Sequence, residues 1–278
     1  MMLDEIIEAA KDLAKEGEET EAISLLDQGL STHANSPPLL LLKARVYDRL
    51  GLFDQALKYF DLAIYHDSSC PEAFYYRAVA YCTLPEYRDR ALSDFEKAVE
   101  LRPGYVDALE GASLARFALG NLGDAVHYAS RAVEVCPTSG EAYYLLGNAL
   151  LAIEEKDSEE LDEAIEALTK SVELSPESAT SWLALGRAYL ERKSGNDLSL
   201  ADHALSQAIA AAPAKPRYWV KRGQIRREMQ DYVAALADYR EAFARTDKDD
   251  SSKRDRIQWR INHMKKKMSS DPDSGRIS

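Results

Sequence analysis

The side chains in this sequence that could carry chemistry are few and scattered. Histidine and cysteine can act as general base, nucleophile or metal ligand, but the three cysteines, Cys70, Cys82 and Cys136, follow no metal-ligand spacing. The sequence contains no phosphate-binding Gly-rich loop, nucleophile elbow, His-Glu-x-x-His helix or calcium-binding loop. We therefore expect no catalytic residue, no metal site and no cofactor.

Charge is distributed unevenly along the 278 residues. The formal net charge is −12, yet the stretch from Lys248 to Ser278 holds nine Lys and Arg against five Asp and Glu. The preceding residues therefore carry a net charge of −16. Such an acidic body disfavours the broad phosphate contacts of nucleic-acid binding and contact with an anionic membrane.

The sequence shows no sign of secretion or of a membrane span. No stretch approaches the roughly 20 apolar residues that a transmembrane helix needs. The first residues, Met-Met-Leu-Asp-Glu, are acidic, unlike a secretory signal. An odd number of cysteines suits reduced thiols that are buried or near turns. We expect a cytoplasmic protein that binds no membrane.

Small residues and prolines recur every 34 residues. The period is visible in the pairs Ala22 and Ala56, Ala44 and Ala78, Ala91 and Ala125, Ala98 and Ala132, and Pro103 and Pro137. Each period also contains apolar residues at helical spacing. In the period at about 37–70 these residues include Leu57, Phe60 and Ile64. Because proline stops a helix and is tolerated in the first turn of the next, each period predicts two helices followed by a proline turn.

This pattern resembles the tetratricopeptide-repeat family, whose 34 residues carry an aromatic, Leu-Gly, Tyr, Ala, an aromatic, Ala and Pro. The fullest match is Trp182, Leu185, Gly186, Tyr189, Ala201, Leu205, Ala208 and Pro213. His127 and His203 share one repeat position, which is typical of a surface pattern rather than of a catalytic base. The resemblance implies an all-α, right-handed superhelical solenoid whose concave face is lined by the first helix of each repeat.

We expect about seven repeats in an array over residues 1–249, at about 3–36, 37–70, 71–105, 106–139, 140–178, 179–215 and 216–249. Repeats five and six carry extra residues between their helices, around 154–158 and 193–198. These insertions are either tolerated without a function or form a recognition edge. Residues 250–268 predict a basic helix that caps the array. Residues 269–278 predict a disordered tail.

The groove along the concave face is the expected binding site. An open solenoid rarely provides the dry pocket in which an enzyme binds a small-molecule substrate. The positions that the resemblance places there are Arg45, Arg49, Tyr75, Leu114, Phe117, Tyr144, Asn148, Arg187, Arg217 and Lys221. Apolar anchors with cations toward both ends suit a peptide or helix of a partner protein. Alternatively, Tyr75, Phe117 and Tyr144 only pack between neighbouring helices.

Some members of the family hold the carboxylate end of a chaperone tail in a clamp of Lys, Asn, Asn, Lys and Arg. Repeats five to seven offer Asn148, Arg217 and Lys221, but Tyr144 replaces the first lysine and Ala184 the middle asparagine. A co-chaperone with a degenerate clamp is therefore the weaker alternative to a non-enzymatic scaffold or adaptor.

A further alternative is that the basic C-terminal helix binds RNA or an acidic partner, although the acidic array makes nucleic acid the less favoured of the two. Its cationic residues are Arg254, Arg256, Arg260, Lys265, Lys266 and Lys267.

Overall fold

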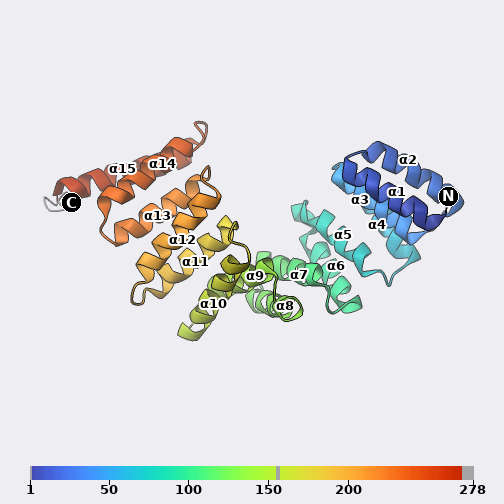
Figure 1. Ribbon diagram of the computed structural model, residues 1–278, viewed down its shortest axis with the longest axis horizontal. Helices are drawn as coiled ribbons and strands as arrows, with labels where there is room; N and C mark the ends of the chain where they lie inside the picture. The colour runs from blue at the N-terminus through green and yellow to red at the C-terminus, as the bar shows by residue number, and fades with distance from the viewer. Residues whose placement is uncertain (1, 155–156, 271–278) are drawn as a thin grey trace. The chain divides into compact units, whose positions relative to one another are not determined.

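The computed structural model describes residues 2–154 and 157–270, and every regular element over these residues is a helix (Figure 1). The chain divides into two compact units, the first ending at Val135 and the second beginning at Cys136. The predicted all-α fold of about seven helical hairpins and a final helix is confirmed.

The first unit contains four helical hairpins. Its elements are α1 (Leu3–Glu16), α2 (Glu19–Thr32), α3 (Pro37–Arg49), α4 (Phe53–His66), α5 (Pro71–Cys82), the 3-10 turn η1 (Pro85–Tyr87), α6 (Arg88–Leu101), α7 (Val106–Ala118) and α8 (Leu122–Val135). Each helix packs on the next, and α1, α3, α5 and α7 also touch in succession. The first helices of these hairpins therefore lie side by side along one face of the unit.

The second unit contains three hairpins and one additional helix. Its elements are α9 (Gly140–Ala152), α10 (Ser158–Leu174), α11 (Ala179–Arg192), α12 (Asp197–Ala211), α13 (Pro216–Glu228), α14 (Tyr232–Arg245) and α15 (Ser251–Ser270). Helix α15 packs on α14 through Ile257, Ile261 and Met264, which are buried and spaced on one helix face. It ends two residues beyond the predicted cap, and residues 271–278 of the predicted tail lie outside the described residues.

Glycines on the first helices let the two helices of a hairpin approach closely. A Cβ added to Gly147 would lie 2.5 Å from Leu168 Cγ, and one on Gly223 would lie 2.8 Å from a ring carbon of Tyr239. Leu168 and Tyr239 are fully buried. A larger residue at either glycine would overpack the hairpin, which explains why the sequence alternates small and large residues at these positions.

Prolines join one hairpin to the next. Pro37, Pro71 and Pro216 each open a first helix, where the missing N–H costs no hydrogen bond. In the turns before α11 and α13 the proline carbonyls accept hydrogen bonds from indoles, Pro176 from Trp182 at 2.8 Å and Pro213 from Trp219 at 3.0 Å. The aromatic residue that marks the repeat thus fixes the turn before it.

The extra residues of repeats five and six lie in different places: some of those in repeat five lengthen helix α10, and those in repeat six lie in the turn before α12. Helix α10 has 17 residues and begins behind an N-cap, Asp157, whose carboxylate accepts hydrogen bonds from two backbone N–H groups. Residues 155–156 of that turn lie outside the described part of the chain. The turn before α12 is held by Asp197, which accepts hydrogen bonds from Arg192 at 2.8 and 2.9 Å and from the Ser194 N–H at 2.8 Å.

Candidate functional site

Several cations on first helices connect neighbouring hairpins. Arg77 of α5 donates to Asp94 on α6 at 2.7 and 2.8 Å and to Asp61 on α4 at 2.6 Å. Arg222 of α13 occupies the same repeat position and donates to Asp238 on α14 at 2.8 and 3.1 Å and to Ser206 on α12 at 2.9 Å. Because Asp94 and Asp238 are buried, these arginines neutralise core carboxylates and have a structural role.

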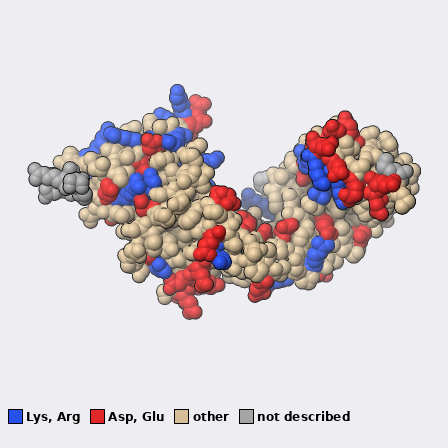
Figure 2. Space-filling model, in the orientation of Figure 1, with Lys and Arg blue, Asp and Glu red and all other residues tan. Residues whose placement is uncertain are grey.

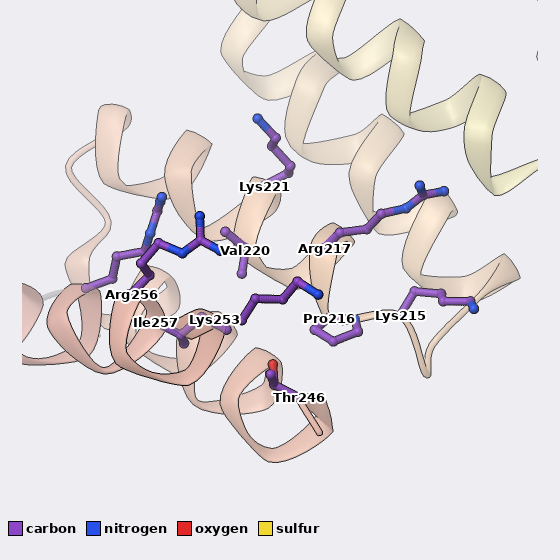
Figure 3. Close-up of a pocket in the computed structure, with 10 residues that line it drawn as sticks. Lys215, Pro216, Arg217, Val220, Lys221, Thr246, Lys253, Arg256 and Ile257 are labelled. Atoms are coloured by element: carbon purple, nitrogen blue, oxygen red, sulfur yellow. The ribbon is translucent and has the colours of Figure 1, made fainter. Parts of the chain in front are cut away.

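Cations at the end of the second unit have different surroundings. A hollow of about 410 Å³ lies between α13 and α15 (Figure 3), and we call it the C-terminal cleft. Pro216, Val220 and Ile257 form its apolar floor. Its other lining residues are Thr246 and six cations: Lys215, Arg217, Lys221, Lys253, Arg256 and Arg260. Among the residues that the structure describes, no Asp or Glu lines the cleft.

Most of these cations lack a carboxylate partner. Lys253 pairs with Asp250 at 2.6 Å. Within the described residues, the other five cleft cations have no Asp or Glu oxygen within 4.0 Å. Arg217 donates instead to the Tyr218 hydroxyl and lies 4.6 Å from the centre of that ring. The cleft is therefore a concentration of positive charge that the described chain leaves uncompensated.

The same positive charge extends onto the first-helix face of the second unit. The pKa of Lys221 is lowered, first by burial of its stem and then by Arg187 and Arg260. Burial raises the pKa of Tyr144, which Arg187 and Arg217 oppose. We call Arg187, Arg217, Lys221 and Arg260 the basic face. Tyr144 therefore lies within electrostatic reach of Arg187 and Arg217, and Lys221 lies within reach of Arg187 and Arg260. All but Arg260 were predicted to line the groove.

The two cations predicted for the groove of the first unit are occupied by contacts within the chain. Arg49 donates to the Ala14 carbonyl and, at 2.8 Å, to Glu19, so it ties α3 to the first hairpin. The Arg45 guanidinium lies 4.1 Å from the centre of the Tyr76 ring.

The aromatic and apolar groove residues differ in their exposure. The Tyr75 ring packs against Tyr105 at 5.1 Å and Phe95 at 6.0 Å, which favours the packing interpretation of this residue. Leu114 is 56% exposed and lines a hollow of about 190 Å³ with Cys82 and Phe95. Phe117 and Asn148 are half-buried.

The chaperone clamp is incomplete in the structure as well. Asn148 lies on α9, and Arg217 and Lys221 lie on α13. Ala184, at the position of the middle asparagine, is only 3% exposed and belongs to the core of α11. A polar side chain could take the place of the missing asparagine only by disrupting the packing of α11 around Ala184.

The residues of α15 divide into structural and exposed groups. Arg254 lies 3.9 Å from the centre of the Phe243 ring and donates to the Thr246 carbonyl at 2.9 Å, so it fastens α15 to the end of α14. Trp259, which the sequence places among the apolar residues of this helix, is 63% exposed and stacks on His263 at 5.3 Å. The spacing from Ile257 already indicates that Trp259 faces away from α14.

Arg217 and Lys221, which the sequence predicted for the groove, line the cleft, but the cleft itself was not predicted. Val220, Lys253 and Ile257 were not predicted as site residues, because the family pattern describes repeat helices and gives no register for a final helix. The signal that could have found them is a cationic helix next to a repeat whose first helix is also cationic.

Two classes of site were sought directly. Over residues 2–154 and 157–270, no group of three or more His, Cys, Asp and Glu side chains is placed to hold a metal ion. None of the helices described here combines the length and apolar character of a membrane span.

Comparison with solved structures shows the same fold in several proteins. A repeat protein from Cytophaga hutchinsonii is 20% identical, with a TM-score of 0.64 over 87% of this chain and 97% of its own. One from Parabacteroides merdae is 18% identical, with a TM-score of 0.60 over 94% and 98%. YrrB, described as having an unusual peptide-binding site, is 23% identical, with a TM-score of 0.56 over 68% and 92%.

Sequence comparison identifies the repeats themselves. No curated protein matches the chain. One tetratricopeptide-repeat model matches residues 13–78, and a second matches three overlapping stretches that together run from 86 to 196. These matches cover more than half of the chain, and the hairpins, the packing glycines and the solved structures agree with them. The chain therefore belongs to the tetratricopeptide-repeat family, whose repeats form protein-interaction scaffolds.

Proposed function

We propose that this chain is a non-enzymatic cytoplasmic scaffold that holds an acidic peptide or helix of a partner protein on the first-helix face of its second unit. The observation that carries the proposal is the basic face beside Tyr144. Arg187, Arg217 and Lys221 are exposed and have no carboxylate partner among the described residues, in a chain of net charge −12.

Electrostatics supports this assignment. Like charges held close together disfavour the folded state, and the lowered pKa of Lys221 reports that repulsion, together with burial. A bound carboxylate would relieve it. Tyrosine and arginine are also the residues that contribute most at protein interfaces, because they combine a rigid apolar surface with directed hydrogen bonds.

The comparisons support a peptide as the bound species. YrrB shares the fold and is described as a peptide-binding protein. The cytoplasmic assignment rests on Cys70, Cys82 and Cys136, all of which are free thiols.

The experiment is affinity capture from the source cell with Tyr144→Ala/Arg187→Glu beside the wild type. The matched control is Arg240→Glu, which makes the same charge reversal at an exposed residue of α14. Circular dichroism checks that each variant is folded. We expect a partner that the double variant loses and the control retains. Equal capture by all three proteins would refute the first-helix face as the binding surface.

A co-chaperone is the narrower alternative within this proposal. A peptide ending in Glu-Glu-Val-Asp tests it directly, with a peptide of the same composition in scrambled order as control. Because Ala184 cannot supply the clamp asparagine, we expect both peptides to bind equally. A strong preference for the native order would make the co-chaperone assignment the better one.

A further inference from the structure

We infer that the C-terminal cleft is a docking site for an acidic peptide segment with one bulky apolar side chain. The apolar side chain inserts between α13 and α15, and the flanking Asp and Glu residues meet the cations around it. This inference rests on the proposed function, because it assigns partner chemistry to the same unit, but it adds to the binding surface the helix α15, which lies outside the repeat hairpins.

The cleft is large enough to take a bulky apolar side chain together with neighbouring peptide atoms. Its volume of about 410 Å³ falls in the range of about 300–1,000 Å³ that is usual for ligand pockets. Pro216 and Val220 form the α13 side of the floor, and Ile257 forms the α15 side. The long stems of the lining Lys and Arg residues add apolar wall, as such side chains do when their charged ends reach water.

The charges around the cleft select an acidic partner. Lys253 and Arg256 extend from α15 toward α13, with Pro216 and Val220 opposite them (Figure 3). The ends of Arg217 and Lys221 point away from α15 (Figure 3), and both residues also belong to the basic face, so the cleft and that face form a continuous cationic surface. A peptide that enters the cleft would meet positive charge along its whole path.

An exposed tryptophan extends this surface. Trp259 lies one turn along α15 from Arg256, and the two share a second, shallower hollow with Arg260 and Asp255. An indole that is 63% exposed buries a large apolar area when a partner covers it, and tryptophan is over-represented among the residues that dominate binding energy.

The same cations could attract RNA, but the structure favours a peptide. RNA binding needs cations that follow an extended phosphate backbone, whereas the unpaired cations here surround an apolar hollow. The remaining surface of the chain carries the excess acid, which Figure 2 shows over α1 and α2. Phosphate contacts also give no role to the apolar lining formed by Val220 and Ile257.

The test measures binding of labelled probes to the full chain by fluorescence anisotropy. The probes are a short Asp- and Glu-rich peptide with one central leucine, the same peptide with serine in place of leucine, and single-stranded oligouridine. We expect the leucine peptide to bind at least tenfold more tightly than the serine peptide and the RNA. Equal binding of the two peptides, or tighter binding of the RNA, would overturn the inference.

Two variants separate the cleft from nearby charge. Arg256→Glu reverses a cleft cation, and Lys265→Glu makes the same change at an exposed residue further along α15, outside the cleft. We expect Arg256→Glu to weaken binding of the leucine peptide by about tenfold or more and Lys265→Glu to leave it within about twofold. An equal effect of both would mean that binding depends on net charge alone and would contradict a defined cleft.

Failure of this inference can be told from failure of the proposed function. If Tyr144→Ala/Arg187→Glu loses its cellular partner while Arg256→Glu keeps it and does not change leucine-peptide binding, the first-helix face is the binding site and the cleft is not. If binding of the leucine peptide depends on Arg256 while Tyr144→Ala/Arg187→Glu still captures the cellular partner, the cleft is a binding site and the first-helix face is not.

Discussion

Two of the arginines of helix α13, Arg217 and Arg222, lie five residues apart in opposite surroundings. Arg222 faces the neighbouring helices, where its side chain is 13% exposed and bonded to the buried Asp238 and to Ser206. Arg217 is exposed, has no carboxylate partner among the described residues and contacts only its neighbour Tyr218 within hydrogen-bond reach. The comparison shows that the role of an arginine follows from the groups that its side chain contacts and not from the residue type alone.

The difference has a free-energy basis. A buried carboxylate that loses its cation is left charged in a medium of low dielectric constant, so removing Arg222 from its pair with Asp238 should destabilise the fold. Unpaired cations at the surface repel one another without any compensating contact in the chain. A carboxylate supplied by a bound partner would remove this repulsion, which is why we propose that Arg217 serves binding.

The largest expected effect is on stability, from Arg222→Ala. It leaves Asp238 with one remaining partner, Arg226 at 3.2 Å, so we expect a loss of about 2–4 kcal/mol in the hairpin α13–α14. Hydrogen exchange followed by mass spectrometry measures this locally, since repeats of an array open separately. Arg240→Ala, at an exposed residue, is the control and should change exchange little. Unchanged protection of α13 and α14 in Arg222→Ala would contradict a structural role.

A smaller effect is expected from Asp197→Asn, at the first residue of α12. The hydrogen bonds from Arg192 hold the pKa of Asp197 below its ordinary value. A carboxylate with a lowered pKa stabilises the folded state above its unfolded-state pKa, and this stability is lost as pH falls through the folded-state value. We expect the variant to cost about 1–3 kcal/mol at neutral pH, and its difference from wild type to shrink in acid.

Asp162→Asn is the matched control for that prediction. Asp162 also pairs with Arg192, at 2.8 Å, but its side chain is 61% exposed, so its removal should cost no more than about 1 kcal/mol. Thermal unfolding across pH compares the two variants. Equal losses would show that burial of Asp197 does not matter.

The smallest effect is expected from Lys221→Gln, and it has the opposite sign. Burial and the neighbouring Arg187 and Arg260 lower the pKa of Lys221. The unfolded chain therefore binds more protons between the two pKa values, and wild-type stability rises as pH increases through the folded-state value. Removing the charge should stabilise the protein by about 0.5 kcal/mol at neutral pH and low salt. A clear loss of stability would show that Lys221 has a partner within the fold.

Much of this molecule could be predicted from the 34-residue period. The period predicts the helices because each apolar stripe must face its neighbour, and it predicts that small residues recur, as Gly147 and Gly223 do at close helix contacts. The groove residues of the first unit could not be assigned in this way. Whether Arg49 faces a ligand or donates to Ala14 and Glu19 depends on side-chain contacts across hairpins, which a repeat pattern does not contain. The cleft was missed for a related reason, because α15 has no repeat register.

The most direct test of the central claim compares Arg217→Gln with Arg222→Gln, two identical changes on one helix. Each variant is measured for its melting temperature and for its affinity for the acidic leucine peptide. We predict that Arg217→Gln weakens binding roughly fivefold, which corresponds to about 1 kcal/mol, and leaves the melting temperature unchanged. Arg222→Gln should lower the melting temperature by several degrees and leave the affinity of the folded protein unchanged. If instead Arg217→Gln lowers the melting temperature as much as Arg222→Gln and the peptide binds as before, the unpaired cations are structural and the account is wrong.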